Sequence, residues 1–463
     1  MSSSLVSHAV APVSARTTAR HWAESFVRRL HTWIGVLIGP FLLIAAFTGT
    51  AYVWTPQLEA LVYRPVLTAT HSGTPLSLTQ QIAAARQQVG DALPLSGVRP
   101  APAAGQTTRA LFNDPTLGEG ERRAVFIDPV SGAVLGEHTV YGTSGALPLR
   151  SWSSKLHRQL LAGETGRLYS ELAASWLWLA ALGGVFVWRR QRLRRPAVTP
   201  GAPRPLRERH AQLGLWLLVA LLFLSASGLT WSRYAGAHIG QWRQAWGWST
   251  PSLQTTLPLA AATAPGGAAA ASSDHSHHHH EAAPAVPTHA GTADVDQVLA
   301  TARTHGIDAG LIEIRPPAAA DKAWTVTEID RRWPTQVDAA AIDGHTLEVI
   351  SRVRFEEFPL AAKLTRWAVD LHMGVMFGWL NQLVLTALGL GLLAMIVWGY
   401  TLWWRRRALT RREPTLWQAL EQAPWRGRLG VLVLGVALGT ALPVMGASLL
   451  VMLALDGVLS LRR

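Results

Sequence analysis

The sequence predicts an α-helical integral membrane protein with four or five spans, an internal parallel repeat and two α+β domains outside the membrane. Apolar runs of about 20 residues, enough to cross a hydrocarbon core of roughly 30 Å, alternate with long polar segments. Arginines cluster at the ends of these runs. The order of histidines, glycines and apolar runs in the first half also recurs in the second half.

Hydropathy and arginine placement divide the chain into segments. The leader and the loops after the second and fourth runs are rich in arginine, so the positive-inside rule places them in the cytoplasm. The long polar segments then lie in the periplasm of a bacterial inner membrane. The first run is longer than the core of a signal peptide, so we expect it to remain as a span. The predicted segments are a cytoplasmic leader (1–30), TM1 (31–54), a periplasmic domain (55–156), a lead-in and TM2 (157–188), an Arg-rich cytoplasmic loop (189–209), TM3 (210–232), a second periplasmic domain (233–371) with a His-rich low-complexity insert (250–290), TM4 (372–404), a cytoplasmic loop (405–428), and a fifth stretch (429–455) that is TM5 or a re-entrant hairpin.

Composition excludes several classes of function. The net charge is +13, but the placement of the arginines indicates membrane topology and not nucleic-acid binding. The absence of cysteine rules out disulfides, cysteine-ligated iron–sulfur clusters and covalent c-type haem. The sequence contains no flavin or NAD motif, no phosphate-binding glycine loop and no nucleophile triad. Any haem must therefore be held by histidine, methionine or tyrosine.

Each long polar segment is expected to form a small α+β domain. Both segments combine a helical stretch with short strand-like runs and a turn built on Asp and Gly. In the first we expect a helix over 78–89, strands near 96–100, 108–113 and 123–128, and a turn at 128–132 leading into 133–135. In the second we expect a helix over 295–305, strands near 311–315 and 323–329, and a turn at 341–345 leading into 346–349.

The two halves of the chain repeat one pattern of histidine, outward span, soluble domain, histidine and returning span. A histidine is followed at +4 and +18 by glycine in each half: His31, Gly35 and Gly49 match His210, Gly214 and Gly228. A second histidine precedes a tryptophan by 31 residues, so that His157 and Trp188 match His372 and Trp403. At about 100° per residue, +4 and +18 lie near the histidine's own helix face, where glycine lets a flat group or another helix approach.

The repeat also pairs the histidines by depth. His31 and His210 both begin outward spans and form an inner pair, whereas His157 and His372 both begin inward spans and form an outer pair. A pseudo-twofold axis along the membrane normal brings like positions together, and two histidines at one level can ligate one haem iron from opposite faces. The pattern therefore predicts two bis-His b-type haems. At 1.5 Å per helical residue, their levels would be roughly 20–27 Å apart.

Several alternatives remain open from the sequence. The glycines can serve helix packing alone, and His21 is another histidine near the first span. The insert contains a cluster of five histidines that can capture metal ions or form an incidental low-complexity tract: His275, His277, His278, His279 and His280.

A family resemblance rests on short motifs around the paired histidines. The motifs are Leu30-His31-Thr32-Trp33-Ile34-Gly35 with Thr48-Gly49, Leu156-His157-Arg158, His210-Ala211-Gln212-Leu213-Gly214 with Ser227-Gly228, and Leu371-His372-Met373-Gly374 with Trp403-Trp404-Arg405. Their order resembles the PepSY-associated transmembrane-helix family over roughly residues 25–455, and the outer domains resemble PepSY-like modules. The resemblance implies an iron-regulated inner-membrane protein of the FoxB-like siderophore-reductase type. The four paired histidines occupy the family's histidine positions.

The expected function is electron transfer to iron. A di-haem b protein would take electrons from a quinol or a cytoplasmic reductase and reduce a periplasmic Fe(III) complex, which the resemblance makes a ferric siderophore. Reduction releases iron because Fe(II) binds hard oxygen ligands more weakly. The alternative is a metal-binding, transport or regulatory membrane protein with PepSY-like partner-binding domains and no redox role. No catalytic side chain is assigned in either case.

Overall fold

The computed structural model of the protein describes residues 22–193, 205–257, 293–410 and 413–461. The chain divides into two compact units, and each is made of segments that are distant in the sequence. The first, which we call the helical unit, comprises Met1–Phe47, Glu164–His238 and Leu388–Arg463. The second, the sheet unit, comprises Thr48–Gly163 and Ile239–Ala387. The chain therefore leaves the helical unit twice and returns to it twice.

Among the residues that the structure describes, five helical stretches are long and apolar enough to cross a membrane, judged by length and composition. They are Trp22–Tyr52 (α2, Trp22–Trp33; η1, Ile34–Ile38; α3, Gly39–Tyr52), Gly163–Arg192 (α8), Leu206–Leu229 (α9), Trp379–Arg406 within α14 (Trp379–Thr410), and Pro443–Leu461 (α17). Four correspond to TM1 to TM4, and the fifth lies in the last apolar stretch. The helices of TM1 and TM3 begin before the predicted spans, because turns that carry arginines continue the helices.

Apolar side chains from these helices meet in one core of the helical unit. Trp176 of α8 is fully buried there, and its indole donates a hydrogen bond to the hydroxyl of Ser448 at 2.8 Å. In lipid, helix association depends on such packing and interhelical hydrogen bonds and not on apolar burial from water. The core includes Ile34, Ile38, Leu42, Ala46, Ala173, Trp176, Leu177, Leu217, Leu221, Leu392, Met445 and Met452.

The first span contains a π-helical segment, η1, directly after His31. Such segments disturb the regular backbone bonding of a helix and are often found at functional sites. The hydroxyl of Tyr400 donates to the carbonyl of Val36 in this segment at 2.9 Å. A π-helix turns through fewer degrees per residue than an α-helix. The prediction that His31 and Gly49 share one helix face assumed uninterrupted α-helix, and η1 changes the angle between them.

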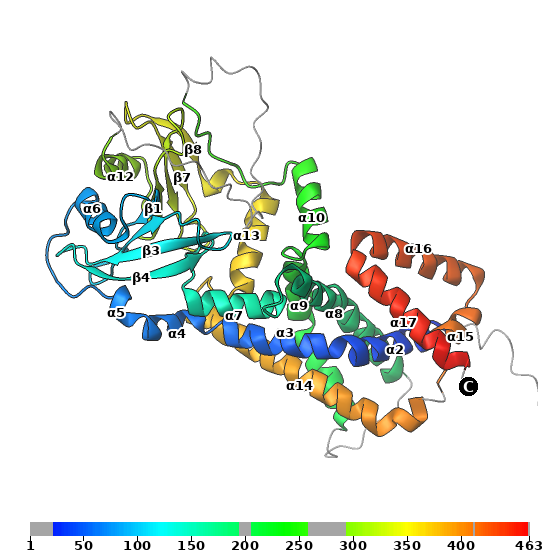
Figure 1. The fold of residues 1–463 in the computed structure, drawn as a ribbon. Helices are drawn as coiled ribbons and strands as arrows, with labels where there is room; N and C mark the ends of the chain where they lie inside the picture. Colours follow the sequence, from blue (N-terminus) through cyan, green and yellow to red (C-terminus); the bar gives the residue numbers. More distant parts are fainter. Residues whose placement is uncertain (1–21, 194–204, 258–292, 411–412, 462–463) are drawn as a thin grey trace, which may run out of the picture. The chain divides into compact units, whose positions relative to one another are not determined.

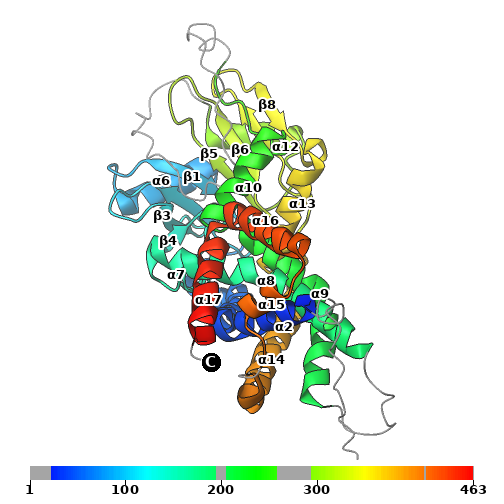
Figure 2. The same ribbon diagram turned by 90° about the vertical axis from the view of Figure 1, so that its right-hand side faces the viewer.

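The last apolar stretch forms a helical hairpin and not one kinked span. Pro443 begins the second helix, where its missing N–H costs no hydrogen bond. A Cβ added to Gly446 would lie 2.7 Å from Cα of Gly439, so the two helices pack closely through glycine. Figure 1 and Figure 2 show the two helices side by side. They are α16 (Trp425–Ala441) and α17 (Pro443–Leu461).

Both ends of this hairpin lie beside α2. A Cβ added to Gly427, near the start of α16, would lie 2.7 Å from the Trp22 ring. Near the end of α17, the buried carboxylate of Asp456 accepts hydrogen bonds from Arg29 at 3.0 Å and from the Trp33 indole at 2.8 Å. The hairpin therefore returns to the side on which it began. The same contacts show that Arg29, assigned to the cytoplasmic charge cluster from the sequence, is a buried ion-pair partner.

The sheet unit is built on one antiparallel sheet of eight strands in the order β4-β3-β2-β1-β5-β6-β7-β8. Each polar segment supplies one helix and four strands, and the two sets of strands run outward from the centre in mirrored order (Figure 1). The elements are α6 (Leu78–Val89), β1 (Leu95–Arg99), β2 (Thr108–Phe112), β3 (Glu121–Ile127) and β4 (Val134–Tyr141), followed in the second segment by α12 (Val295–Thr304), β5 (Ile312–Arg315), β6 (Trp324–Glu328), β7 (Ala339–Ile342) and β8 (Val349–Val353).

The expectation of two separate domains is therefore wrong. Strand β1 pairs directly with β5, with Val98 opposite Ile314. The carboxylate of Asp296 in α12 also accepts the backbone N–H of Leu78 at 2.7 Å, at the start of α6. Apolar side chains from both segments share one core on the face of the sheet that α6 and α12 cover. The sequence did not reveal the junction because strand edges carry no marker of their partner.

A buried charge cluster lies at this junction, on the sheet face opposite α6 and α12. Glu313 of β5 accepts hydrogen bonds from Arg99 at 2.7 Å, Arg122 at 3.1 Å and Arg315 at 2.6 Å. Burial alone would raise the pKa of Glu313, but the three guanidinium groups hold it well below its usual range. The cluster joins strands from both halves of the chain, so it stabilises the sheet only while Glu313 is ionised.

Short helices connect the sheet to the spans. They are α4 (Thr55–Val62), α5 (Arg64–Leu67), α7 (Pro148–Gln159), α10 (Tyr234–Ala245), the 3-10 turn η2 (Phe355–Glu357), α13 (Leu360–His372) and α15 (Leu416–Glu421). The sequence did not predict α10 or strand β7. Strand β7 is Ala-Ala-Ala-Ile, a composition that favours helix, but it is buried between β6 and β8.

Candidate functional site

The four paired histidines lie on four different helices. His31 is near the end of α2, and His210 is in the first turns of α9. His157 is near the end of α7, and His372 is the last residue of α13. The outer pair therefore does not begin the inward spans as predicted. Residues with positive φ interrupt the helical backbone between α7 and α8 and between α13 and α14. Each outer histidine closes a short amphipathic helix just before a span.

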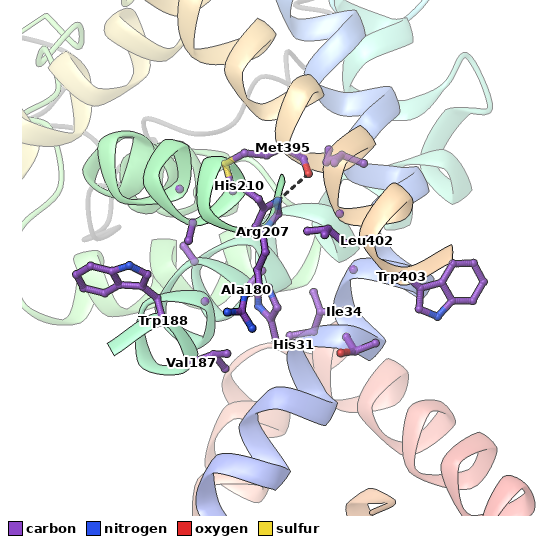
Figure 3. Close-up of a pocket in the computed structure, with 18 of the residues that line it drawn as sticks. His31, Ile34, Ala180, Val187, Trp188, Arg207, His210, Met395, Leu402 and Trp403 are labelled. Carbon is purple, nitrogen blue, oxygen red and sulfur yellow. Dashed lines mark hydrogen bonds between the residues drawn. The ribbon is translucent and has the colours of Figure 1, made fainter. Parts of the chain in front are cut away.

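His31 and His210 line one cavity of about 1200 Å³ inside the helical unit. Its walls come from α2, η1, α8, α9 and α14, and Figure 3 shows both histidines in it together with Trp188 and Trp403. The volume exceeds the 300–1,000 Å³ typical of pockets for small molecules and cofactors. Apolar residues such as Leu177, Leu392 and Ile396 form much of the wall. The cavity suits a large, flat, mainly apolar group.

The ring of His210 is held in one orientation by a backbone group. Its Nδ1 lies 3.1 Å from the carbonyl oxygen of Met395 in α14. A carbonyl oxygen only accepts, so Nδ1 must donate, and Nε2 of a neutral ring keeps a free lone pair. Metal-ligating histidines usually donate their other ring N–H in this way. His210 is thus prepared to act as a ligand through Nε2.

The ring of His31 packs against α8 where two glycines adjoin. A Cβ at Gly184 would lie 3.2 Å from Cε1 of His31, and a Cβ at Gly183 would lie 3.8 Å from Nδ1. The backbone carbonyl of Ala180 in the same helix lies within hydrogen-bonding reach of the His31 ring. The His31 ring is therefore oriented by α8.

The predicted glycines separate into different roles. Gly35 and Gly214 both line the cavity of the inner pair; a Cβ at Gly35 would meet nothing within 4 Å, and a Cβ at Gly214 would meet the Met395 side chain at 3.2 Å. Gly49 instead lies against the outer pair. Gly228 is near the end of α9 and is not among the residues that line the cavity. Sequence reasoning missed Gly183, Gly184 and Gly399, although paired glycines in an apolar span are a visible signal of close approach.

The outer pair is anchored at the end of the first span. Nδ1 of His157 shares a hydrogen bond with the hydroxyl of Thr48 at 2.9 Å. A Cβ added to Gly49 would lie only 2.9 Å from Cε1 of His157, so the ring occupies the space that the glycine leaves. Removal from water, and secondarily the nearby His157, lower the pKa of His372 to about 4. The two imidazoles are therefore close enough to interact, and His372 is neutral at physiological pH, as a ligand must be.

Polar contacts fix the two helix ends that flank the outer pair. The amide of Gln382 at the start of α14 donates to the carbonyl of Val53 at 2.9 Å and bonds with Gln57. The indole of Trp54 donates to the hydroxyl of Thr386 at 2.9 Å. These bonds hold the residues just after α3 against the start of α14. They thereby fix the end of α3, which carries Thr48 and Gly49 beside His157, within the sheet unit.

The described residues contain no cluster of three or more side chains of the kinds that ligate metal ions, namely His, Asp, Glu and Cys. The His-rich tract with His275, His277, His278, His279 and His280, and the alternative ligand His21, lie outside the described residues. Whether that tract captures metal stays a prediction.

Within the described residues, five apolar helices, one antiparallel sheet and a cavity lined by His31 and His210 define a helical membrane protein with a large sheet unit and a cofactor-sized histidine site. The chain belongs to the family of the PepSY-associated TM region, whose model matches residues 28–406. The family resemblance seen in the sequence is confirmed, whereas the FoxB-like subtype stays a prediction. No curated protein matches the chain.

Proposed function

We propose that this membrane protein binds two b-type haems in bis-His ligation and passes electrons across a bacterial inner membrane to a periplasmic Fe(III) complex. His31 and His210 would hold the inner haem, and His157 and His372 the outer haem. The observation that carries the proposal is the pairing itself. His31 and His210 line one cavity, His157 lies near enough to His372 to lower its pKa, and in each case the two histidines come from different halves of the chain.

The residues at both sites fit a haem. Haem iron is commonly held by neutral imidazole through one ring nitrogen. The bond from Nδ1 of His210 to the Met395 carbonyl leaves Nε2 of that ring to face a ligand, and the bond with Thr48 holds the His157 ring in place. The inner cavity adds apolar walls and two tryptophans. Bound haem would supply reversible one-electron transfer, and the protein's part is to orient the rings and to exclude water.

The direction of transfer rests on topology. Positive-inside placement of the arginine-rich loops puts the inner pair near the cytoplasm and the sheet unit in the periplasm. A quinol or a cytoplasmic reductase would give up the electron, and Fe(III) in a ferric siderophore or similar chelate would accept it and become Fe(II). Both imidazoles of a pair would be used in holding the haem, so the chelate would not bind the haem iron directly. The acceptor would be bound by residues of the sheet unit.

The test is haem stoichiometry in the purified full-length protein. We expect two haems per chain and a reduced-minus-oxidised spectrum with the sharp bands of low-spin b haem. His31→Ala and His210→Ala should each lose the same haem, and His157→Ala and His372→Ala should each lose the other. Each variant would then retain about half of the haem, because loss of one axial ligand opens the site.

His238→Ala is the matched control. His238 also lies on a helix and also bonds a backbone carbonyl, that of Ala441 at 3.1 Å, but it belongs to neither pair. It should keep both haems. A wild-type protein without haem overturns the proposal. Stoichiometric metal without haem would support metal binding instead, and neither signal would support a regulatory scaffold.

A further inference from the structure

The C-terminal hairpin places a buried carboxylate against α2, the helix that carries His31. Asp456 of α17 is fully buried, and its Oδ1 accepts hydrogen bonds from Nε of Arg29 at 3.0 Å and from the Trp33 indole at 2.8 Å. Its other oxygen, Oδ2, accepts the backbone N–H of Leu416 at the start of α15. Both carboxylate oxygens are therefore used, and one side chain joins α2, α15 and α17. Figure 1 and Figure 2 show α15 and α17 beside α2.

The carboxylate holds the face of α2 that points away from the cavity of the inner pair. Arg29 and Trp33 are each two residues from His31, about 200° around the helix axis. His31 lines the cavity, whereas Arg29 and Trp33 are not among its lining residues. The Arg29 guanidinium lies over the Trp33 ring, 5.3 Å from its centroid, so the two side chains present one polar surface to Asp456. Contact on this face directs His31 toward the cavity.

The π segment η1 makes such a contact necessary. It follows α2 directly and separates it from α3, which packs in the core of the helical unit. A π segment departs from the regular α-helical bonding, and its loss or displacement along the helix would turn α2 relative to α3. The packing of α3 therefore does not by itself fix the rotation of α2. The C-terminal segment contacts α2 at its start as well, where a Cβ at Gly427 would lie 2.7 Å from the Trp22 ring.

We propose that Asp456 is a positioning residue for the inner site: by holding Arg29 and Trp33 it fixes the rotation of α2 and so the angle at which the His31 imidazole meets the haem iron. This inference rests on the proposed function. Hydrogen bonds to a buried carboxylate are short and directional, which suits this role. Asp456 lies beyond residue 406, where the match to the family model ends. The hairpin thus adds a support to α2, whereas His210 on α9 is oriented by the carbonyl of Met395.

The test is the electron paramagnetic resonance spectrum of the ferric inner haem, because the g values of a bis-His haem depend on the angle between the two imidazole planes. The protein is the full-length chain in detergent carrying His372→Ala, so that only the inner haem reports. Asp456→Asn should shift the g values and the midpoint potential, since it removes the charge and leaves one acceptor too few. Asp456→Glu should restore the spectrum in part, because the carboxylate returns.

A second variant covers the case in which Asp456→Asn does not fold, since it leaves the Arg29 charge buried without a partner. Arg29→Met with Asp456→Leu replaces the ion pair by apolar side chains, an exchange that is often tolerated in a protein interior. It should fold and show the same shift in g values. In the haem-free protein, backbone amides of α2 should exchange with deuterium about 10-fold faster or more, while those of α9 keep their protection.

Two tryptophan substitutions form a matched pair. Trp33→Phe removes only the indole bond to Asp456 and should shift the g values less than Asp456→Asn does. Trp417→Phe is the control, because its indole donates to the carbonyl of Leu453 at 3.1 Å, within the C-terminal segment. It should leave the spectrum of the inner haem unchanged.

The outcomes separate the two proposals. If α2 exchanges faster but the g values and the midpoint potential of every variant match those of the parent protein, Asp456 only holds the hairpin, and the positioning role is wrong although the ligation stands. Unchanged exchange would show that the contact does not restrain α2 at all. Loss of the inner haem from the Arg29→Met and Asp456→Leu protein, with α9 still protected, would be the stronger form of the expected result. If the parent protein binds no haem at His31 and His210, the proposed function itself fails.

Discussion

The position of the His157 imidazole depends on a missing Cβ. Its ring packs against Gly49, and an added methyl group would lie 2.9 Å from Cε1 of the ring. That distance is shorter than real Cβ contacts allow. At the inner site, the same relation holds less tightly between Gly184 and His31, at 3.2 Å. A glycine therefore makes room for a histidine ring at both sites. At Gly49 the space is filled by the imidazole of His157 and not by a macrocycle.

Substitution of Gly49 tests this role. Gly49→Ala should displace the His157 ring and weaken its hydrogen bond with Thr48. The amount of bound outer haem should fall, while the inner haem remains bound. Overpacking of this kind costs about 1–3 kcal/mol of stability. The measurement is haem content together with thermal unfolding in detergent.

Gly430→Ala supplies the comparison for Gly49, because it lies on an exposed face of α16 where a Cβ meets nothing within 4 Å. Its haem content should equal that of the wild type, and its stability should not fall, since alanine is the better helix former. Normal haem and normal stability in Gly49→Ala would show that the contact is not restrictive.

At the scale of elements, the junction between β1 and β5 depends on ionised Glu313. One carboxylate there bonds three arginines from three strands. The folded-state pKa of Glu313 lies below its usual value of 4.5. The stabilisation is therefore fully present above about pH 4.5 and is lost as the pH falls toward the folded-state pKa. Acid should loosen the sheet at its centre before its outer strands separate.

Glu313→Gln should destabilise the sheet unit by about 3–5 kcal/mol at neutral pH, because it leaves buried arginines without their counter-charge. It should also flatten the dependence of stability on pH below about 4.5. Urea unfolding at pH 7 and at pH 3.5, followed by tryptophan fluorescence, measures both effects. Glu348→Gln, on an exposed turn, should change stability by less than about 0.5 kcal/mol. Equal unfolding of the Glu313→Gln variant and the wild type would contradict the assigned role.

The sequence predicts some of these elements and not others, for physical reasons. Spans and the helices over 78–89 and 295–305 depend on local length, periodicity and capping, so they are predictable. Strand β7 is not, because its alanines become a strand only through burial between neighbours. The π segment after His31 has no local marker in Ile-Gly-Val-Leu-Ile. The inner and outer histidine pairs could be proposed because the repeat relates them. The hydrogen bond between His210 and the carbonyl of Met395 could not be predicted, since it depends on how α14 packs against α9.

At the scale of the whole molecule, one sheet joins the two halves of the chain. Val98 and Ile314 are direct partners in the centre of that sheet. Directly opposed residues in antiparallel strands have Cβ atoms about 4.5–5.5 Å apart, close to the range that a disulfide bridges. The native chain has no cysteine, so an engineered pair has no competitor.

Val98→Cys with Ile314→Cys should therefore form an intramolecular disulfide on mild oxidation, seen as a mass loss of two hydrogens and faster migration on a non-reducing gel. Val98→Cys with Val353→Cys should not, because β8 lies four strands from β1, about 19 Å away at 4.8 Å per strand. Failure of the first pair to close, or closure of both, would contradict one continuous sheet with this register.

The π segment at Ile34–Ile38 has a consequence for comparing relatives. His31 and His210 are each followed by glycine at +18, yet only the first interval contains the irregular turn, because α9 is uninterrupted. The two intervals contain the same number of residues but turn through different angles about the helix axis. The angle between His31 and Gly49 therefore differs from the angle between His210 and Gly228. In an ideal α-helix each residue adds about 100° of rotation about the axis. Deleting one residue from this segment would therefore place His31 on another side of the helix relative to Gly49, although both residues and their neighbours are unchanged. Among homologues, the number of residues between His31 and Gly49 should thus be more constrained than their chemical nature.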